Sequence, residues 1–131
     1  MMNDLHKTIS EMKFSSLCSG DITMPDKETI AFKVKQSFHN NRIEEFFCLR
    51  QTEDGLFLSD EGTTLANLDN TFELGEPDVI KNIVSVLKKF DMVKVGCMFV
   101  YRIDTKADVI SQILRYLQGI HFLYAMKLFY D

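Results

Sequence analysis

The strongest constraint on the fold is a pattern of strands and turns between residues 30 and 58. Apolar and polar residues alternate over residues 30–38, which is typical of a strand with one buried face. Residues 43–50 are apolar on both faces, as in a central strand. Asp54-Gly55 is a hairpin turn signal that leads into residues 56–58. The sequence therefore predicts a three-stranded antiparallel meander.

Helical spacing predicts the elements around this meander. A first helix is expected over residues 3–18, and a short one from Thr63 or Thr64 with Leu65 and Leu68 inside. A third is expected after Glu76-Pro77-Asp78, because proline and acids favour a first turn. We expect its buried stripe to comprise Ile80, Ile83, Val84, Leu87 and Phe90.

A second hairpin and a long helix complete the predicted fold. Residues 92–95 and 98–102 form the hairpin around Gly96, and a helix runs from Thr105 to about Tyr130 with Asp108 completing a capping box. With no linker or repeat in 131 residues, the prediction is a single domain over residues 1–131. Its class is α+β, an antiparallel sheet with helices packed on one side.

Residues 55–68 resemble a known family. Ser59-Asp60-Glu61-Gly62 followed by Thr64, Leu65 and Leu68 is similar to the turn and helix of the bacterial and phage domain-of-unknown-function family numbered eighteen twenty-eight. The resemblance extends from about Thr23 to the C-terminus. It implies an intracellular protein from phage or a mobile element, and it carries no catalytic residue with it.

The sequence contains no complete catalytic, metal or cofactor motif. Pro77-Asp78 and Asp104-Thr105-Lys106 resemble a metal-dependent nuclease pattern, but two helix starts explain them as well. The histidines are scattered, and Glu53, Asp54, Asp60 and Glu61 fit turn chemistry as readily as a cation site. We therefore predict no cofactor and no metal, with a nuclease as the competing enzyme hypothesis.

Cysteine usage and hydropathy predict the compartment. Three cysteines without a C-x-x-C pair indicate reduced thiols, and no apolar stretch is long enough to span a bilayer. We expect a cytoplasmic protein that binds no membrane.

Charge is distributed unevenly along the chain. Between Gln51 and Ile80 there are eight acids and no Lys or Arg, while the other 11 acids face 15 basic residues. The segment is therefore −8 and the rest of the chain +4, which predicts an acidic face that steers the protein to a basic partner. The residues assigned to it are Asp54, Asp60, Glu61, Asp69 and Glu73.

The closing helix supplies the second candidate surface. Its polar face, with Ser111, Arg115 and Gln118, continues by helical spacing into apolar residues. Exposed apolar residues there would need a partner or a second copy of the chain. The residues assigned to this contact are Phe122, Met126 and Phe129.

Together these features predict a non-enzymatic protein-binding module. One role is an acidic inhibitor of a host defence nuclease, such as a CRISPR effector, whose partner is a basic nucleic-acid-binding enzyme. The net charge of −4 argues against direct nucleic-acid binding. An oligomeric regulatory subunit, such as a homodimer, is the third hypothesis.

Overall fold

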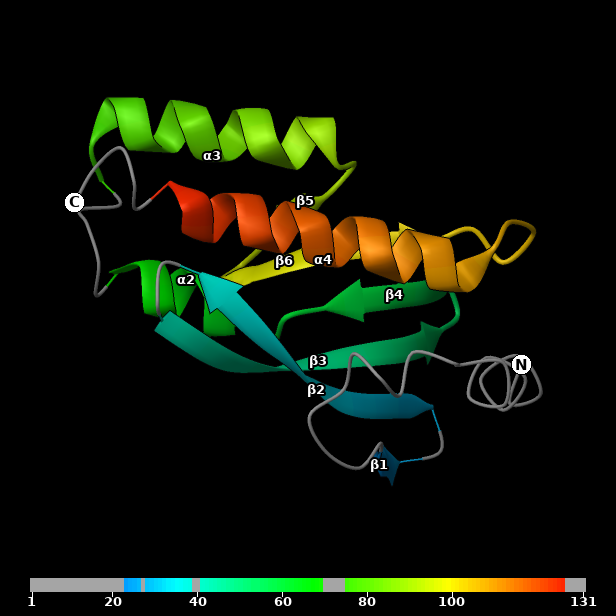
Figure 1. The fold of residues 1–131 in the computed structure, drawn as a ribbon. Helices are drawn as coiled ribbons and strands as arrows, with labels where there is room; N and C mark the ends of the chain where they lie inside the picture. Colours follow the sequence, from blue (N-terminus) through cyan, green and yellow to red (C-terminus); the bar gives the residue numbers. More distant parts are fainter. Residues whose placement is uncertain (1–22, 27, 39–40, 70–74, 127–131) are drawn as a thin grey trace.

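The computed structural model describes residues 23–26, 28–38, 41–69 and 75–126. These residues form a six-stranded antiparallel sheet in the order β1-β2-β3-β4-β6-β5 (Figure 1). The strands are β1 (Thr23–Asp26), β2 (Thr29–Phe38), β3 (Asn41–Thr52), β4 (Gly55–Ser59), β5 (Val93–Val95) and β6 (Met98–Ile103). The predicted meander and second hairpin are confirmed, and β6 pairs with β4 to join them. The prediction missed β1, a short strand on the edge of β2.

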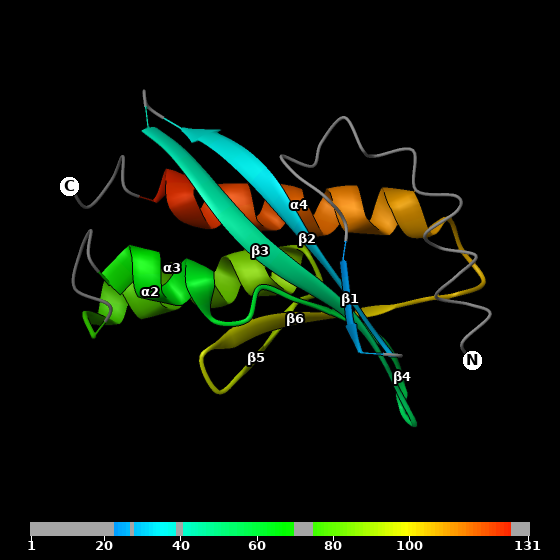
Figure 2. The same ribbon diagram turned by 90° about the horizontal axis from the view of Figure 1, so that it is seen from below.

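The described residues form three helices, which lie on one side of this sheet (Figures 1 and 2). They are α2 (Thr63–Asp69), α3 (Pro77–Lys89) and α4 (Val109–Ala125). Figure 2 shows β2 and β3 crossing in front of α4, which packs beside α3. The α+β class with helices on one side is therefore confirmed. The first predicted helix, over residues 3–18, lies outside the described residues.

The strand pattern of period two determines which side chains the helices cover. Ile30 pairs with Leu49 and Leu49 with Leu58, and all three are fully buried on what we call the inner face. Phe99 and Ile103 continue this layer on β6 and pack in the same hydrophobic cluster. None of the described helices is long and apolar enough to cross a membrane.

The buried stripe of α3 differs from the predicted one. Val79, Ile83 and Leu87 face the core, while Ile80 and Val84 are 48% and 43% exposed. Residues four apart lie on nearly the same side of a helix. The side of α3 that packs on the core is therefore centred on Val79, Ile83 and Leu87. The sequence offered two adjacent apolar series, and only packing against α4 selects between them.

The start of α4 also differs from the prediction. The helix begins at Val109, and Asp108 is its N-cap, accepting a hydrogen bond from the Ser111 backbone N–H. Upstream, Asp104 accepts from the Lys106 N–H at 3.0 Å and holds residues 104–106 in a turn. This turn delays the helix by four residues from the predicted Thr105. The described helix ends at Ala125, and the predicted extension to Tyr130 lies outside the described residues from 127 onward.

Candidate binding surface and the buried carboxylates

The turn that carries the family resemblance is built around Asp60. Its side chain is fully buried, and its two oxygens accept hydrogen bonds from the backbone N–H groups of Gly62, Thr64 and Phe99 at 2.9–3.2 Å. Glu61 and Gly62 have positive φ angles of 55° and 86°, so the turn requires left-handed backbone. Asp60 therefore fastens the start of α2 to β6. The prediction that Asp60 contacts a partner is wrong, because its carboxylate is enclosed by the backbone donors it satisfies.

A second carboxylate is buried beside this turn. Glu45 on β3 is fully buried and accepts hydrogen bonds from the hydroxyls of Tyr124 and Thr64. Asn67 donates in turn to the Tyr124 hydroxyl oxygen at 2.9 Å. Burial, with a smaller contribution from the charge of Asp60, raises the pKa of Glu45 to about 7, although the hydrogen bonds from Tyr124 and Thr64 act to lower it. The network joins β3, α2 and α4, and its fully buried carboxylates are shielded from any substrate in solution.

The acidic segment does not form one continuous face in the described residues. Glu53 and Asp54 are exposed in the β3–β4 turn, and Glu76 and Asp78 are exposed at the start of α3. Figures 1 and 2 place these two segments at opposite ends of the molecule. Glu61 forms a salt bridge with Arg50 at 3.4 Å. The side chain of Asp69 and the whole of Glu73 lie outside the described residues.

The closing helix matches its prediction in part. Ser111, Arg115 and Gln118 are exposed, and Phe122 is 45% exposed. Met126 is instead buried in the core, so its predicted partner contact is wrong. Each step of four residues rotates the side chain by about 40° around a helix, which turns this series from solvent toward the core. Phe129 lies outside the described residues.

Phe122 already has neighbours within the chain. Its ring centroid lies 5.4 Å from that of Phe90, and the Lys89 ammonium lies 4.9 Å from its centroid. These contacts shield part of the ring, so the exposed area of this candidate site is smaller than the sequence implied.

The residues of the nuclease pattern do not converge. Asp78 is in the first turn of α3, while Asp104 follows β6 at the opposite end of the molecule (Figures 1 and 2). In the described part of the chain, no three His, Cys, Asp or Glu side chains are grouped to hold a metal ion. The nuclease-like pattern therefore arises from two unrelated features: Asp78 lies at the start of α3, and Asp104 lies at the start of a turn.

A further exposed surface is the outer face of the sheet, which faces away from α2, α3 and α4. Its side chains lie on the opposite side of each strand from the buried layer. Thr29 and Ser59 also lie on this side and are buried, at 2% and 5% exposure, while the other described side chains there are at least partly exposed. The outer face consists of Ala31, Lys33, Phe46, Cys48, Arg50, Phe57, Val93, Val95, Met98, Val100 and Arg102.

Cross-strand pairs organise the outer face. Lys33 pairs with Phe46 and holds its ammonium 5.3 Å from the ring centroid. Phe57 lies between Arg50 and Arg102 in the register, with the Arg102 guanidinium carbon 5.9 Å from its ring centroid. These distances are within the range of cation–π contacts, in which the ring face attracts the cation. The outer face therefore combines apolar area with positive charge.

The sequence does not predict this exposed surface. Residues 43–50 are apolar on both faces, which predicts a central strand that is covered on both sides. The strand is central, but every described helix lies on the inner face. Phe46 is consequently 57% exposed. The apolar residues at the outer positions of this strand are the feature of the sequence that could have indicated an exposed apolar surface.

Comparisons with known proteins do not extend the resemblance. No family model matches the chain, and searches of curated proteins and of solved structures found no significant match.

Proposed function

We propose that this protein is a non-enzymatic protein-binding module that docks its partner on the outer face of the sheet. The observation that carries the proposal is the exposure of apolar residues there: Phe46 and Val93 are 57% exposed and Val95 is 50% exposed. Burying such a side chain is worth about 1.5–3 kcal/mol, so covering several favours association. Large exposed apolar side chains on one face of a sheet are characteristic of interaction sites in proteins.

The charge of the outer face indicates what the partner presents. Lys33, Arg50 and Arg102 lie among the apolar residues, and Arg50 already pairs with Glu61. A partner surface that is apolar with a few acids would match this arrangement. Burial would then supply most of the affinity, and charge would mainly set orientation.

A matched pair of variants tests the location of the site. Phe46→Thr with Val93→Thr removes apolar area from the outer face and keeps β-forming residues. Ile80→Gln with Val84→Gln removes apolar area from the exposed side of α3 and keeps helix-forming residues. We expect the first variant to lose a partner captured by the wild-type protein and the second to retain it. The reverse result would contradict the proposal.

Salt dependence separates this mode of binding from the acidic inhibitor expected from the sequence. If exposed acids such as Asp54 steer the chain to a basic nuclease, association should slow strongly as salt increases. If the outer face binds by burial, the affinity should change little with salt. Sedimentation of the purified chain tests the remaining alternative, in which the partner is a second copy.

A further inference from the structure

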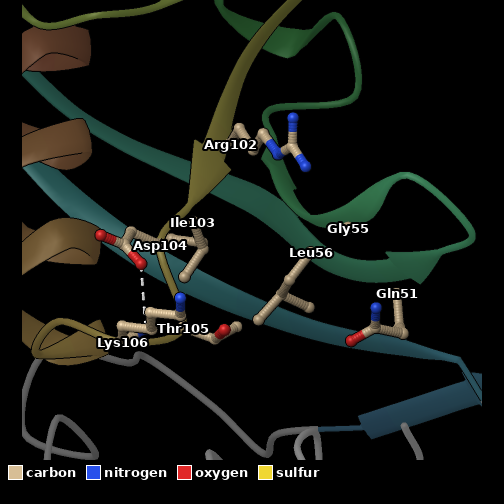
Figure 3. Close-up of a pocket in the computed structure, with 8 residues that line it drawn as sticks. All are labelled: Gln51, Gly55, Leu56, Arg102, Ile103, Asp104, Thr105 and Lys106. Atoms are coloured by element: carbon tan, nitrogen blue, oxygen red, sulfur yellow. Dashed lines mark hydrogen bonds between the residues drawn. The ribbon is translucent and has the colours of Figure 1, made fainter.

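A separate pocket lies at one end of the sheet, where β3 ends, β4 begins and β6 leaves the sheet. It has a volume of about 440 Å³, within the range of small-molecule sites. Figure 3 shows Gln51 on one side and Arg102 and the 104–106 turn on the others. The pocket is lined by Gln51, Gly55, Leu56, Arg102, Ile103, Asp104, Thr105 and Lys106.

Gln51 provides an unusual acceptor in this lining. The residue is only 9% exposed, and its amide nitrogen donates to the Thr52 carbonyl oxygen at 3.2 Å. Its Oε1 atom is buried and has no hydrogen-bond partner. Rotating the amide would set the oxygen against the Thr52 carbonyl, so the Thr52 contact fixes Oε1 as the end without a partner. Figure 3 shows this oxygen turned toward Leu56. Buried acceptors are nearly always satisfied, so this atom points to a missing donor.

The same pocket has two cations on its lining. Arg102 and Lys106 are both exposed, and the lining also includes the exposed carboxylate of Asp104, which accepts a hydrogen bond from the Lys106 backbone N–H. The Arg102 guanidinium lies over Gly55, where a β-carbon would be 3.2 Å from its Nε. Glycine at this turn therefore leaves room for the arginine beside the pocket.

The far rim of the pocket is held in place by Gln112 on α4. Its Oε1 accepts from the Asp104 N–H, and its Nε2 donates to the Asp104 carbonyl oxygen, both at 2.8 Å. The turn that carries Lys106 is thereby fixed to the helix rather than left as a free loop. A rim positioned in advance lowers the cost of ordering it around a ligand.

We propose that this pocket binds a small organic anion that also carries an N–H or O–H donor. Its phosphate or carboxylate contacts Arg102 and Lys106, and its donor satisfies Gln51 Oε1. This inference goes beyond the proposed protein-binding function: it shares Arg102 with the outer face, but Gln51, Lys106 and the 104–106 turn do not belong to that face.

Binding measured by nuclear magnetic resonance titration tests the proposal with two groups of ligands. The four common ribonucleoside monophosphates supply phosphate with a base donor, and free amino acids supply carboxylate with an ammonium donor. Inorganic phosphate and acetate are the controls that carry charge alone. We expect saturable shifts at the pocket for a member of one group, at least about tenfold tighter than for the matching simple anion, because one added hydrogen bond is worth about that factor.

Two variants assign the contacts. Gln51→Met removes the acceptor and Arg102→Met removes a cation, and each should weaken the best ligand by about tenfold or more. Lys94→Met, on β5, removes an exposed cation that does not line the pocket and should leave binding unchanged. Circular dichroism and a thermal unfolding curve confirm that each variant is folded. Absence of saturable binding in both groups, simple anions that bind equally well, or a Gln51→Met variant that binds like the wild type would each overturn the proposal.

Discussion

The Tyr124 hydroxyl on α4 donates a hydrogen bond to the Glu45 carboxylate on β3, across 79 residues of chain. The last described helix is thus tied to the central part of the sheet by a polar contact inside the core. Thr64 and Asn67 on α2 complete the network. A buried polar network is stable only when each of its polar groups has a hydrogen-bond partner. The stability of the protein should therefore depend on the protonation of Glu45 and on the hydrogen bonds within the network.

Stability should depend on pH through Glu45. Folding raises the pKa of this carboxyl from 4.5 to about 7, chiefly because burial disfavours its charged form. The folded state therefore holds a proton that the unfolded state releases, and stability falls as pH rises from 4.5 to about 7. The loss should approach about 3 kcal/mol and then stay constant at higher pH.

Urea unfolding at pH 5 and pH 8 measures this effect. Glu45→Gln cannot ionise, so it should resemble the wild type at pH 5 and exceed it at pH 8. Exposed Glu53→Gln is the control and should follow the wild-type profile. Wild-type and Glu45→Gln profiles that run parallel would show that Glu45 does not titrate in this window.

Asp60 should be among the most sensitive positions for stability. Asp60→Ala leaves the N–H groups of Gly62, Thr64 and Phe99 without their acceptor. Each buried group left unsatisfied costs about 1–3 kcal/mol, so we expect a loss of about 3 kcal/mol or more. Glu61→Ala removes only a partly exposed salt bridge and should cost less than about 1 kcal/mol. Equal losses in urea unfolding would contradict the assigned role of Asp60.

Gly119 should resist replacement by alanine at the contact between α3 and α4. A β-carbon there would lie 2.6 Å from Met92 Cε and 3.0 Å from Phe90 Cγ. The methionine end can move, but the Phe90 ring is packed, and overpacking costs about 1–3 kcal/mol. This exceeds the gain of about 1 kcal/mol from better helix propensity, so Gly119→Ala should destabilise the protein. Gly75→Ala, with no atom within 4 Å of its β-carbon, is the matched control and should be neutral in thermal unfolding.

Two glutamines should respond in opposite ways to the same substitution. Gln51→Met removes a buried acceptor that has no hydrogen-bond partner, and it also removes the hydrogen bond to the Thr52 carbonyl oxygen. The net effect should be to stabilise the ligand-free protein by about 1 kcal/mol. Gln112→Met removes bonds to Tyr101, Asp104 and Asp108 and should destabilise it by about 2 kcal/mol. Thermal unfolding of both variants checks the sign. A destabilised Gln51→Met would mean that its Oε1 has a partner in solution.

The local elements of this fold follow from the sequence by itself. The alternation in residues 30–38, the Asp54-Gly55 turn and the Pro77 helix start each act over a few residues. Backbone preference and side-chain period are set at that range, so the meander, the second hairpin and α3 could be predicted. The start of α4 could not, because the competing turn at residues 104–106 is secured by Gln112, which is eight residues away from Asp104.

The tertiary structure decided which of these surfaces is covered and what the charged residues do. Periodicity separates the two faces of β3 but does not say that the described helices all pack on one of them, which leaves Phe46 on the surface. Asp60 has the sequence context of an exposed turn, yet Phe99, 39 residues later, brings a third N–H group to it and encloses it. Burial and hydrogen-bond satisfaction depend on partners distant in the chain, and only the folded arrangement supplies those partners.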